Sequence, residues 1–326
     1  MSLTGWAELL AGGLITGGIY ALVAIGLNLQ YGLMRIMNIS HGEFLMLGAF
    51  ATWWAHTALG ISPLLFMPVA FALLMALGMT VHWLCFRQVA ARAPNVDVFE
   101  ARSLMVGFGL MFLVQNTALL VWGGDLRGYD YLADPVQVGE MRFTANKLVL
   151  FGVALALSLL LIALLKLTLL GKAVRALMQS PTGAQLVGIN TKRLHPLMFG
   201  IGLGLSGVAG ALLSMTYEIS PSMGEPYTVT ALIVITLGGF GSIAGSLVGG
   251  LLLGVVEALG MYYTSPSLKM LLSYAVFIGV LIWRPNGLFS RKSFFPFQET
   301  SRGWCCASAS CWRLPCHGSR RSSWPR

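Results

Sequence analysis

Runs of about twenty apolar residues recur along this chain, and the repetition limits the folds that it can adopt. The first covers residues 9–29 and contains no charged side chain, and a similar run covers residues 148–170. A helix of this length crosses the hydrocarbon core of a bilayer. Its backbone groups are hydrogen-bonded within the helix, as lipid requires. The sequence therefore predicts an all-α integral membrane protein with many spanning helices.

Composition and charge agree with a membrane protein and exclude a soluble enzyme. Hydrophobic residues make up 56% of the chain and charged residues only 10%, whereas soluble domains carry about 25% charged residues. The net charge of +9 comes from basic residues in short gaps between apolar runs. That placement is typical of membrane topology rather than of nucleic-acid binding.

Further apolar runs bring the expected number of spans to about eight or nine. They cover residues 41–56, 64–86, 103–122, 196–217 and 269–283. A longer stretch, residues 228–263, is interrupted by the glycines Gly238, Gly239 and Gly241. Because glycine weakens a helix, we expect two short or broken helices there.

The composition changes after Lys292, so we expect a transmembrane domain over residues 1–292 and a separate basic tail over residues 293–326. Four of the five cysteines lie in this tail: Cys305, Cys306, Cys311 and Cys316. The last two, with His317, could ligate a metal, but their spacing fits no zinc pattern. The tail shows no helical period, and we expect it to be unstructured, with no metal site.

Charged residues between the apolar runs predict which loops face the cytoplasm. Residues 166–195 carry five basic side chains and no acidic one, and residues 87–102 carry three arginines. Basic loops are retained on the cytoplasmic side. Residues 123–146 and 218–225 are acidic by comparison, and we expect both to face outward.

A polar segment over residues 26–43 stands out from the apolar background. It contains Asn28, Asn38, His41 and Glu43, with glycines that permit an unwound backbone. Polar groups in a membrane are costly unless they face water, one another or a pathway, and transporters use unwound helices at such sites. We take these four residues and Glu257, an acidic residue in another apolar run, as substrate-pathway candidates. Packing between helices, or an interfacial loop for the segment, is the alternative interpretation.

A second polar segment, residues 171–190, is predicted to lie on the cytoplasmic face. A short helix over residues 182–187, ended by Gly188, is expected there. The basic, exposed character of the whole segment over residues 171–190 suits docking to another protein, and a solvated loop that only sets topology is the alternative. The candidate docking residues are Arg175, Thr182, Gly183, Ala184, Gly188 and Ile189.

These segments resemble the permease subunits of ABC importers for branched-chain amino acids, of the LivH type. The resemblance runs in order over residues 7–290. Its motifs are Gly26-Leu27-Asn28-Leu29 with His41-Gly42-Glu43, Gly171-Lys172-Ala173-Val174-Arg175-Ala176 with Gly188-Ile189-Asn190, and Leu237-Gly238-Gly239-Phe240-Gly241-Ser242. In that family a Glu-Ala-Ala sequence, separated by three residues from a following Gly, couples the permease to its ATPase. Here Thr182-Gly183-Ala184 and Gly188 keep the spacing without the acidic residue.

The resemblance implies a chain that works in the bacterial inner membrane with several partners. They are a second permease (a related chain or a second copy), two cytoplasmic ABC ATPase subunits, a periplasmic substrate-binding protein and membrane lipid. ATP and Mg would be bound by the ATPases, because this chain has no Gly-x-x-x-x-Gly-Lys-Ser/Thr phosphate loop. We therefore expect no cofactor in this chain and no enzyme activity of its own.

Other functions remain compatible with the sequence. Permeases for urea or short-chain amides are very similar, so the cargo is open. An ATP-independent secondary transporter or channel would need no cytoplasmic docking segment, and a structural membrane protein would not need the polar residues over 26–43.

Overall fold

The computed structural model describes residues 3–138, 141–263, 268–283 and 287–288. The tail over residues 293–326 lies outside the described residues, so the prediction that its cysteines form no metal site falls outside them too. The basic residues Arg284, Arg291 and Lys292 also lie outside them.

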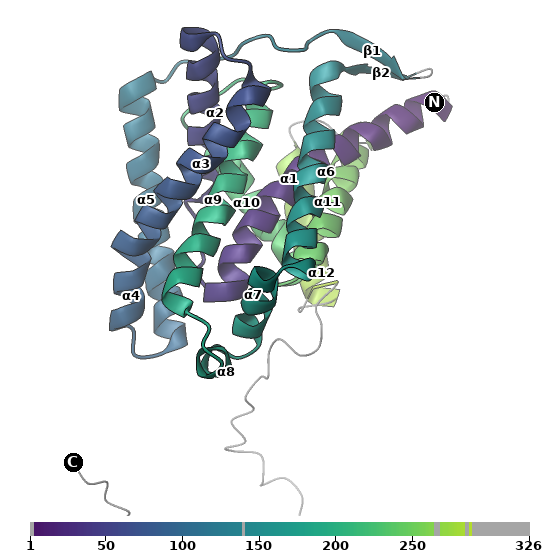
Figure 1. The fold of residues 1–326 in the computed structure, drawn as a ribbon. Coiled ribbons are helices and arrows are strands. Elements are labelled where there is room, and N and C mark those ends of the chain that lie inside the picture. Colours follow the sequence, from purple (N-terminus) through teal and green to yellow (C-terminus); the bar gives the residue numbers. More distant parts are fainter. Residues whose placement is uncertain (1–2, 139–140, 264–267, 284–286, 289–326) are drawn as a thin grey trace, which may run out of the picture. The chain divides into compact units, whose positions relative to one another are not determined.

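Helices dominate the described part of the chain (Figure 1). In the first half they are α1 (Leu3–Met34), α2 (His41–Leu59), α3 (Pro63–Val81), the π-helix η1 (His82–Phe86), α4 (Arg87–Arg92) and α5 (Val96–Trp122). In the second half they are α6 (Ala145–Leu167), α7 (Leu169–Gln179), α8 (Pro181–Leu186), α9 (Thr191–Ser214), α10 (Gly224–Gly238), α11 (Ile243–Tyr263) and α12 (Lys269–Trp283). Strands β1 (Pro135–Val138) and β2 (Met141–Thr144) form a small antiparallel hairpin.

Among the described residues, six helical stretches are long and apolar enough to cross a membrane. They are Gly5–Met34, Pro63–Arg92, Val96–Trp122, Ala145–Leu167, Thr191–Ser214 and Ile243–Tyr263. Helices α2, α10 and α12 complete the bundle as shorter or more polar members. The all-α, multi-span prediction is confirmed.

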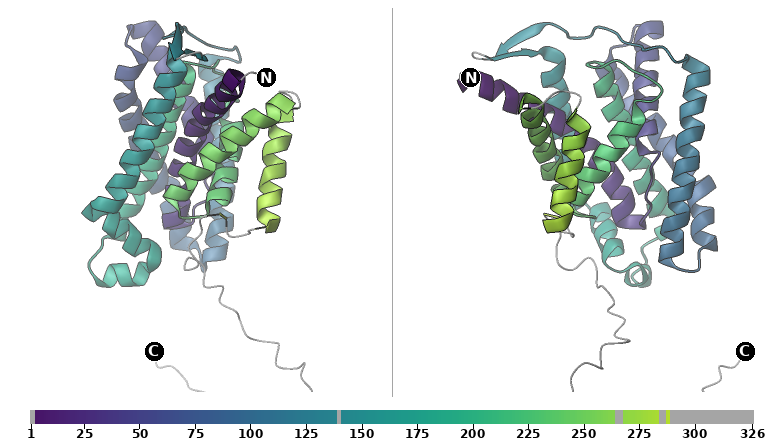
Figure 2. Two further views of the ribbon diagram at one scale, coloured as in Figure 1. Left: turned by 90° about the vertical axis from the view of Figure 1, so that its right-hand side faces the viewer. Right: turned by 180° about the vertical axis from the view of Figure 1, so that it is seen from behind.

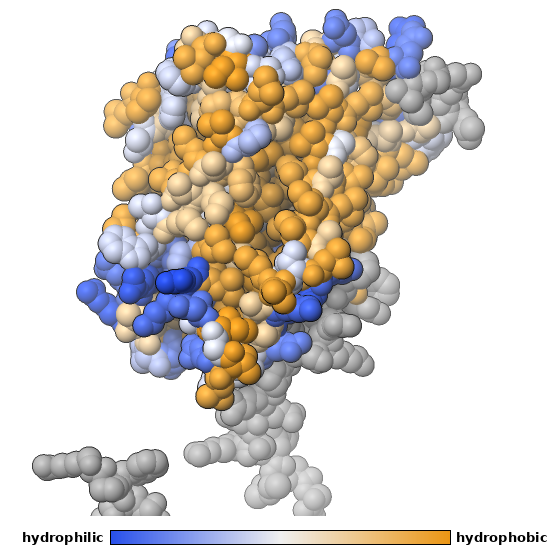
Figure 3. All heavy atoms as spheres, viewed as in Figure 1, coloured by the Kyte–Doolittle hydropathy of each residue, from blue (hydrophilic) through white to orange (hydrophobic). Residues whose placement is uncertain are grey.

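The two ends of the bundle differ in charge as the loops predicted. Helices α4, α7 and α8 lie at one end and the β-hairpin at the other (Figure 1). On the face shown in Figure 3, hydrophobic side chains cover most of the surface between the ends, and most of the hydrophilic surface lies toward the ends. The end with α7 and α8 carries the five basic residues over 166–195, so we expect it to face the cytoplasm by the positive-inside rule.

The outer loops pack onto the bundle rather than extending from it. The backbone of Arg127 pairs with that of Ile219, and the hydroxyl groups of Tyr129 and Ser214 lie 2.9 Å apart. Burial raises the pKa of Tyr129 to about 12, so its hydroxyl stays neutral. The sequence did not predict the β-hairpin beside this loop, because its strands of four residues each are too short to show an alternating pattern.

Helix α1 is the central element of the described bundle, in contact with α6, α9, α10 and α11. Its residues from Ile19 to Leu29 are almost fully buried. Helices α3 and α5 instead present exposed apolar side chains such as Leu65 and Leu120, as expected of lipid-facing positions. Figure 2 shows α11 and α12 together on one flank of the same bundle.

Close helix contacts in the core depend on glycine. A side chain at Gly210 of α9 would overlap the carbonyl oxygen of Leu45 in α2, and one at Gly26 of α1 would overlap that of Gly202 in α9. Lipid supplies no hydrophobic force between helices, so such close approach is a main source of their association.

The chain leaves helical geometry at two places inside the bundle. Between α1 and α2, residues 35–40 form an irregular segment that begins at Arg35, which has a left-handed φ of 54°. Between α10 and α11, residues 239–242 form a turn with positive φ at Gly239 and Gly241. Helices α10 and α11 are therefore a hairpin, and this fits the expected pair of short helices.

Some predicted boundaries were wrong. Helix α5 begins at Val96 instead of residue 103, because it continues past the apolar run into the polar cytoplasmic end. Helix α1 likewise extends beyond residues 9–29 at both ends, with its polar residues Asn28 and Gln30 buried against neighbouring helices.

Candidate functional site

Asn28 holds the turn between α10 and α11. Its side-chain nitrogen donates to Ser246 Oγ at 2.7 Å and to the carbonyl oxygen of Ser242 at 3.1 Å. Its side-chain oxygen accepts from the backbone nitrogen of Gly241 at 2.7 Å. Asn28 is fully buried, so one amide side chain replaces the hydrogen bonds that the helix break would otherwise leave unmade. The three glycines predicted as helix breakers, Gly238, Gly239 and Gly241, lie at this turn.

A second network holds the irregular segment of residues 35–40 against α1. Asn38 donates from its side-chain nitrogen to Gln30 Oε1 at 3.2 Å and accepts at Oδ1 from the Ser40 hydroxyl at 2.6 Å. Because Gln30 lies in α1, these bonds keep the segment alongside the helix.

His41 extends this network to the middle of α1 and to α9. Its Nε2 lies 3.2 Å from the carbonyl oxygen of Val23, and its own carbonyl oxygen accepts from Ser206 Oγ at 2.9 Å. Gln30 Nε2 lies 3.5 Å from His41 Nδ1. Helix α2 therefore begins inside the bundle, beside the midpoint of α1.

Glu43 differs from its neighbours because neither carboxyl oxygen has a hydrogen-bond partner among the described residues. Its side chain is fully buried in the first turn of α2. The adjacent Gly42 packs closely against Gly224 at the start of α10, and its backbone nitrogen donates to Thr228 Oγ1 at 2.8 Å. A buried carboxyl group without partners is costly, and such groups in membrane helices usually mark a functional position.

Glu257 lies in α11, apart from the other candidates. It accepts from the Tyr20 hydroxyl at 2.8 Å and also from the Ser273 hydroxyl. These bonds link α1, α11 and α12. The structure thus brings Asn38 and His41 together through Gln30, places Glu43 next to them in sequence, and puts Asn28 and Glu257 at separate helix contacts.

The predicted docking helix is present as α8 at the cytoplasmic end. Ser180 caps it by accepting from the backbone nitrogen of Gly183 at 3.1 Å. The backbone nitrogen of Ile189 donates to the carbonyl oxygen of Ala184 at 3.0 Å, and Gly188 ends the turn with a φ of 85°. Ala184 is buried, which anchors the helix on the bundle.

Two apolar side chains next to this anchor point away from the bundle. Leu186 is 84% exposed and Val187 is 75% exposed. The space-filling view shows hydrophobic surface at this end, over α8 (Figure 3). Of the other candidates, Thr182 is exposed and Arg175 donates to the carbonyl oxygen of Lys166 at 3.4 Å.

Several residues that these sites depend on were not predicted from the sequence. Gln30, Ser206 and Thr228 complete the networks around residues 38–42, and Leu186 with Val187 forms the exposed tip. Gln30 lies within the polar segment and could have been included on that ground. The others are ordinary helix residues, and only their spatial neighbours reveal a role. No group of three or more His, Cys, Asp or Glu side chains suited to a metal ion occurs in the described part of the chain.

Comparison with known proteins identifies the family of this chain. A family described as the permease component of the branched-chain amino acid transport system matches residues 9–281. The chain belongs to this family. It is accordingly a multi-pass permease of the inner membrane, and it serves as one component of a larger transport system.

Individual relatives match nearly the whole permease. The high-affinity branched-chain amino acid transport system permease protein BraD of Pseudomonas aeruginosa is 30% identical, over 88% of this chain and 96% of that protein. The corresponding protein LivH of Salmonella typhimurium is 31% identical, over 86% of this chain and 94% of that protein. LivM of Escherichia coli is more distant, at 24% identity over 83% of this chain and 67% of that protein.

We expect Asn28→Leu to destabilise the protein by about 2–4 kcal/mol, because the buried groups that bond to the Asn28 amide would be left without hydrogen-bond partners. Thermal unfolding of the purified protein in detergent measures the effect. Asn116→Leu is the matched control, since the exposed Asn116 side chain bonds only to the carbonyl oxygen of Phe112 in its own helix. Equal unfolding temperatures for the two variants would contradict the role given to Asn28.

Proposed function

We propose that this chain is the permease subunit of an ABC importer that moves leucine, isoleucine and valine into the cell. Membership of the family over residues 9–281 carries the proposal. The names of the relatives BraD and LivH, which refer to branched-chain amino acids, support the cargo. ATP hydrolysis takes place on partner subunits, and this chain has no enzyme activity of its own.

The proposed complex contains two permeases, two cytoplasmic ATPases and a periplasmic substrate-binding protein. Escherichia coli has two different permease proteins of this kind, LivH and LivM, and both resemble this chain. The greater likeness to LivH supports a related but different chain as the second permease. Membrane lipid surrounds the complex.

We place the substrate pathway along the irregular segment of residues 35–40 and the start of α2. Asn38 and His41 have hydrogen bonds within the described structure, so in this proposal they hold the segment that borders the pathway. Asn28 and Glu257 have hydrogen bonds at separate helix contacts, and in this proposal they position the helices around the pathway. Glu43 has none, and it is the residue that we expect to meet water or substrate when the helices move. Transport requires at least two such states, and ATP-driven closure of the partners shifts their balance.

Helix α8 and its exposed tip are the proposed contact with an ATPase. The anchored Ala184 and the capped first turn give the segment a fixed geometry, while Leu186 and Val187 offer apolar surface to a partner. A motion of the ATPase can then reach α7 and α9, which flank α8 in the chain.

Uptake into proteoliposomes tests the function directly. The permease is purified with its partners from neighbouring genes and reconstituted with ATP in the lumen, and labelled leucine is added outside with the binding protein. Leucine accumulation that needs both ATP and the binding protein, and that valine inhibits, is the expected result. Uptake without ATP would overturn the importer, and inhibition by urea but not by valine would change the cargo.

We expect Glu43→Gln to lower the initial rate of leucine uptake by about tenfold, because a buried ionisable group at a pathway is functional. Glu218→Gln is the control, since Glu218 is exposed at the outer end. Both variants are assayed in the same proteoliposomes at equal permease content. Unchanged uptake together with a higher unfolding temperature would show that Glu43 only packs between helices.

We expect the double change Leu186→Asp and Val187→Asp to reduce copurification of the ATPase by about tenfold or more, since it removes two apolar side chains from the contact. The conservative pair Leu186→Met and Val187→Ile should retain the ATPase. Copurification on an affinity-tagged permease, normalised to permease content, measures both. Equal ATPase recovery with the two pairs would rule out this tip as the docking contact.

A further inference from the structure

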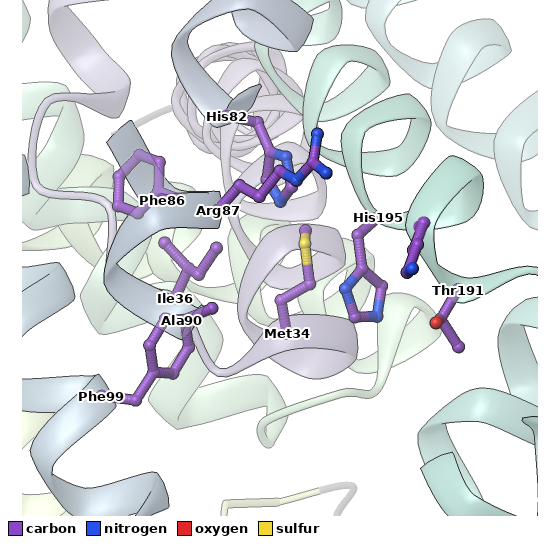
Figure 4. Close-up of a pocket in the computed structure, with 10 residues that line it drawn as sticks. Met34, Ile36, His82, Phe86, Arg87, Ala90, Phe99, Thr191 and His195 are labelled. Atoms are coloured by element: carbon purple, nitrogen blue, oxygen red, sulfur yellow. The ribbon is translucent and has the colours of Figure 1, made fainter. Parts of the chain in front are cut away.

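A cavity of about 210 Å³ lies at the end of the described structure that carries α4 and α8. It is surrounded by the end of α1, η1, α4, α5 and the start of α9, and Ile36 of the irregular segment over residues 35–40 also lines it. Figure 4 shows its side chains. They are Met34, Ile36, His82, Phe86, Arg87, Ala90, Phe99, Thr191, Lys192 and His195.

The polar part of this lining is basic. His82, Arg87, Lys192 and His195 contribute nitrogen groups, and no acidic side chain lines the cavity. Thr191 is the first residue of α9, a helix of 24 residues, so the positive end of its dipole lies at the cavity as well. A helix amino terminus next to basic side chains favours an anion.

An unsatisfied group in the wall provides a second, independent observation. His82 is only 7% exposed, and its Nδ1 has no hydrogen-bond partner among the described residues. It lies in η1, and π-helical turns inside α-helices are often found at functional sites. Leaving a buried nitrogen unpaired costs free energy, so a ligand with an acceptor atom would supply what the protein lacks.

The rest of the wall is apolar and narrows the chemistry of the ligand. Met34, Phe86 and Phe99 line it, and exposed Trp83 and Leu84 lie beside it on η1. A small soluble anion gains nothing from these side chains, whereas an acyl chain does. The volume is below the roughly 300–1,000 Å³ of sites for drug-sized ligands, which suits a headgroup rather than a whole lipid.

We propose that this cavity binds the phosphate group of an anionic phospholipid from the cytoplasmic leaflet. Basic pockets between helices on the cytoplasmic side are suited to such headgroups. Arg87 and Lys192 hold the phosphate by charge, and His82 donates a hydrogen bond from Nδ1. The acyl chains lie outside, along the apolar surface of η1. The site needs only a permease embedded in the membrane and does not depend on the identity of the cargo.

Such a lipid would link η1 and α4 to the start of α9. Helix α9 continues directly from the docking segment α8. A bound headgroup therefore stabilises one arrangement of α4 and α9, so we expect lipid composition to alter the rate of transport.

Native mass spectrometry of the intact permease with added phosphatidylglycerol tests the proposal. The variant Arg87→Gln with Lys192→Gln should retain the lipid about tenfold less, because each basic residue near a membrane surface contributes to holding an anionic lipid. The matched control is Arg92→Gln with Arg193→Gln. It removes the same charge from the same two helices at residues that do not line the cavity, and it should change retention by less than about twofold.

A third variant, His82→Leu, tests the hydrogen bond separately. It should weaken retention of phosphatidylglycerol, because the hydrogen bond from Nδ1 to the phosphate is lost. Equal retention of phosphatidylglycerol by all variants would overturn the proposal. If the Arg87→Gln and Lys192→Gln variant retained phosphatidylglycerol but no longer copurified with the ATPase, the proposal would also be overturned. The cavity would then bind acidic side chains of a protein partner.

Inorganic phosphate distinguishes the two sources of the same group. Excess phosphate that displaces phosphatidylglycerol from the permease, but not from the Arg87→Gln and Lys192→Gln variant, supports a shared phosphate site. Binding of inorganic phosphate without any retention of phosphatidylglycerol would overturn the lipid as its source.

Discussion

Every backbone amide and carbonyl group inside a membrane has to find a partner within the protein, and this requirement explains most of the described structure. Long helices meet it by themselves. The interruption over residues 239–242 meets it through a side chain of α1. The interruption over residues 35–40 is held against the same helix by a hydrogen bond between side chains. Asn28 bonds the turn between α10 and α11 on one side, while Gln30 and Asn38 hold the other segment. Helix α1 is central because its side chains contact both interruptions.

Glycine makes these side-chain contacts geometrically possible. Residues such as Gly26, Gly42 and Gly210 allow backbones of different helices to meet without an intervening side chain. The polar groups of α1 can then reach carbonyl oxygens on α9 and α11. In lipid, where apolar contact alone does not drive association, tight packing and hydrogen bonding have to act together. The chain uses both at the same places, which leaves the buried, unpartnered Glu43 as a clear departure.

The sequence predicted what depends on local pattern and missed what depends on contacts. Apolar runs gave the spans, and Gly238 to Gly241 gave the break between α10 and α11. Gly188 marked the end of α8. The partner of each polar residue could not be predicted, because Asn28 and Gly241, or His41 and Ser206, are brought together only by folding. His82 showed this most clearly, since a histidine near a helix end looks like an ordinary interfacial residue until its neighbours are known.

The hydrogen bonds of the first helix also bear on biosynthesis. Asn28 forms hydrogen bonds with Gly241 and Ser246, and the carbonyl oxygen of His41 accepts one from Ser206, all of which come much later in the chain. When the first two helices leave the ribosome, these partners have not yet been synthesised. The nascent chain therefore holds unsatisfied polar groups until α9 and α11 enter the bilayer. Its N-terminal part reaches its final structure only after the C-terminal helices have been inserted.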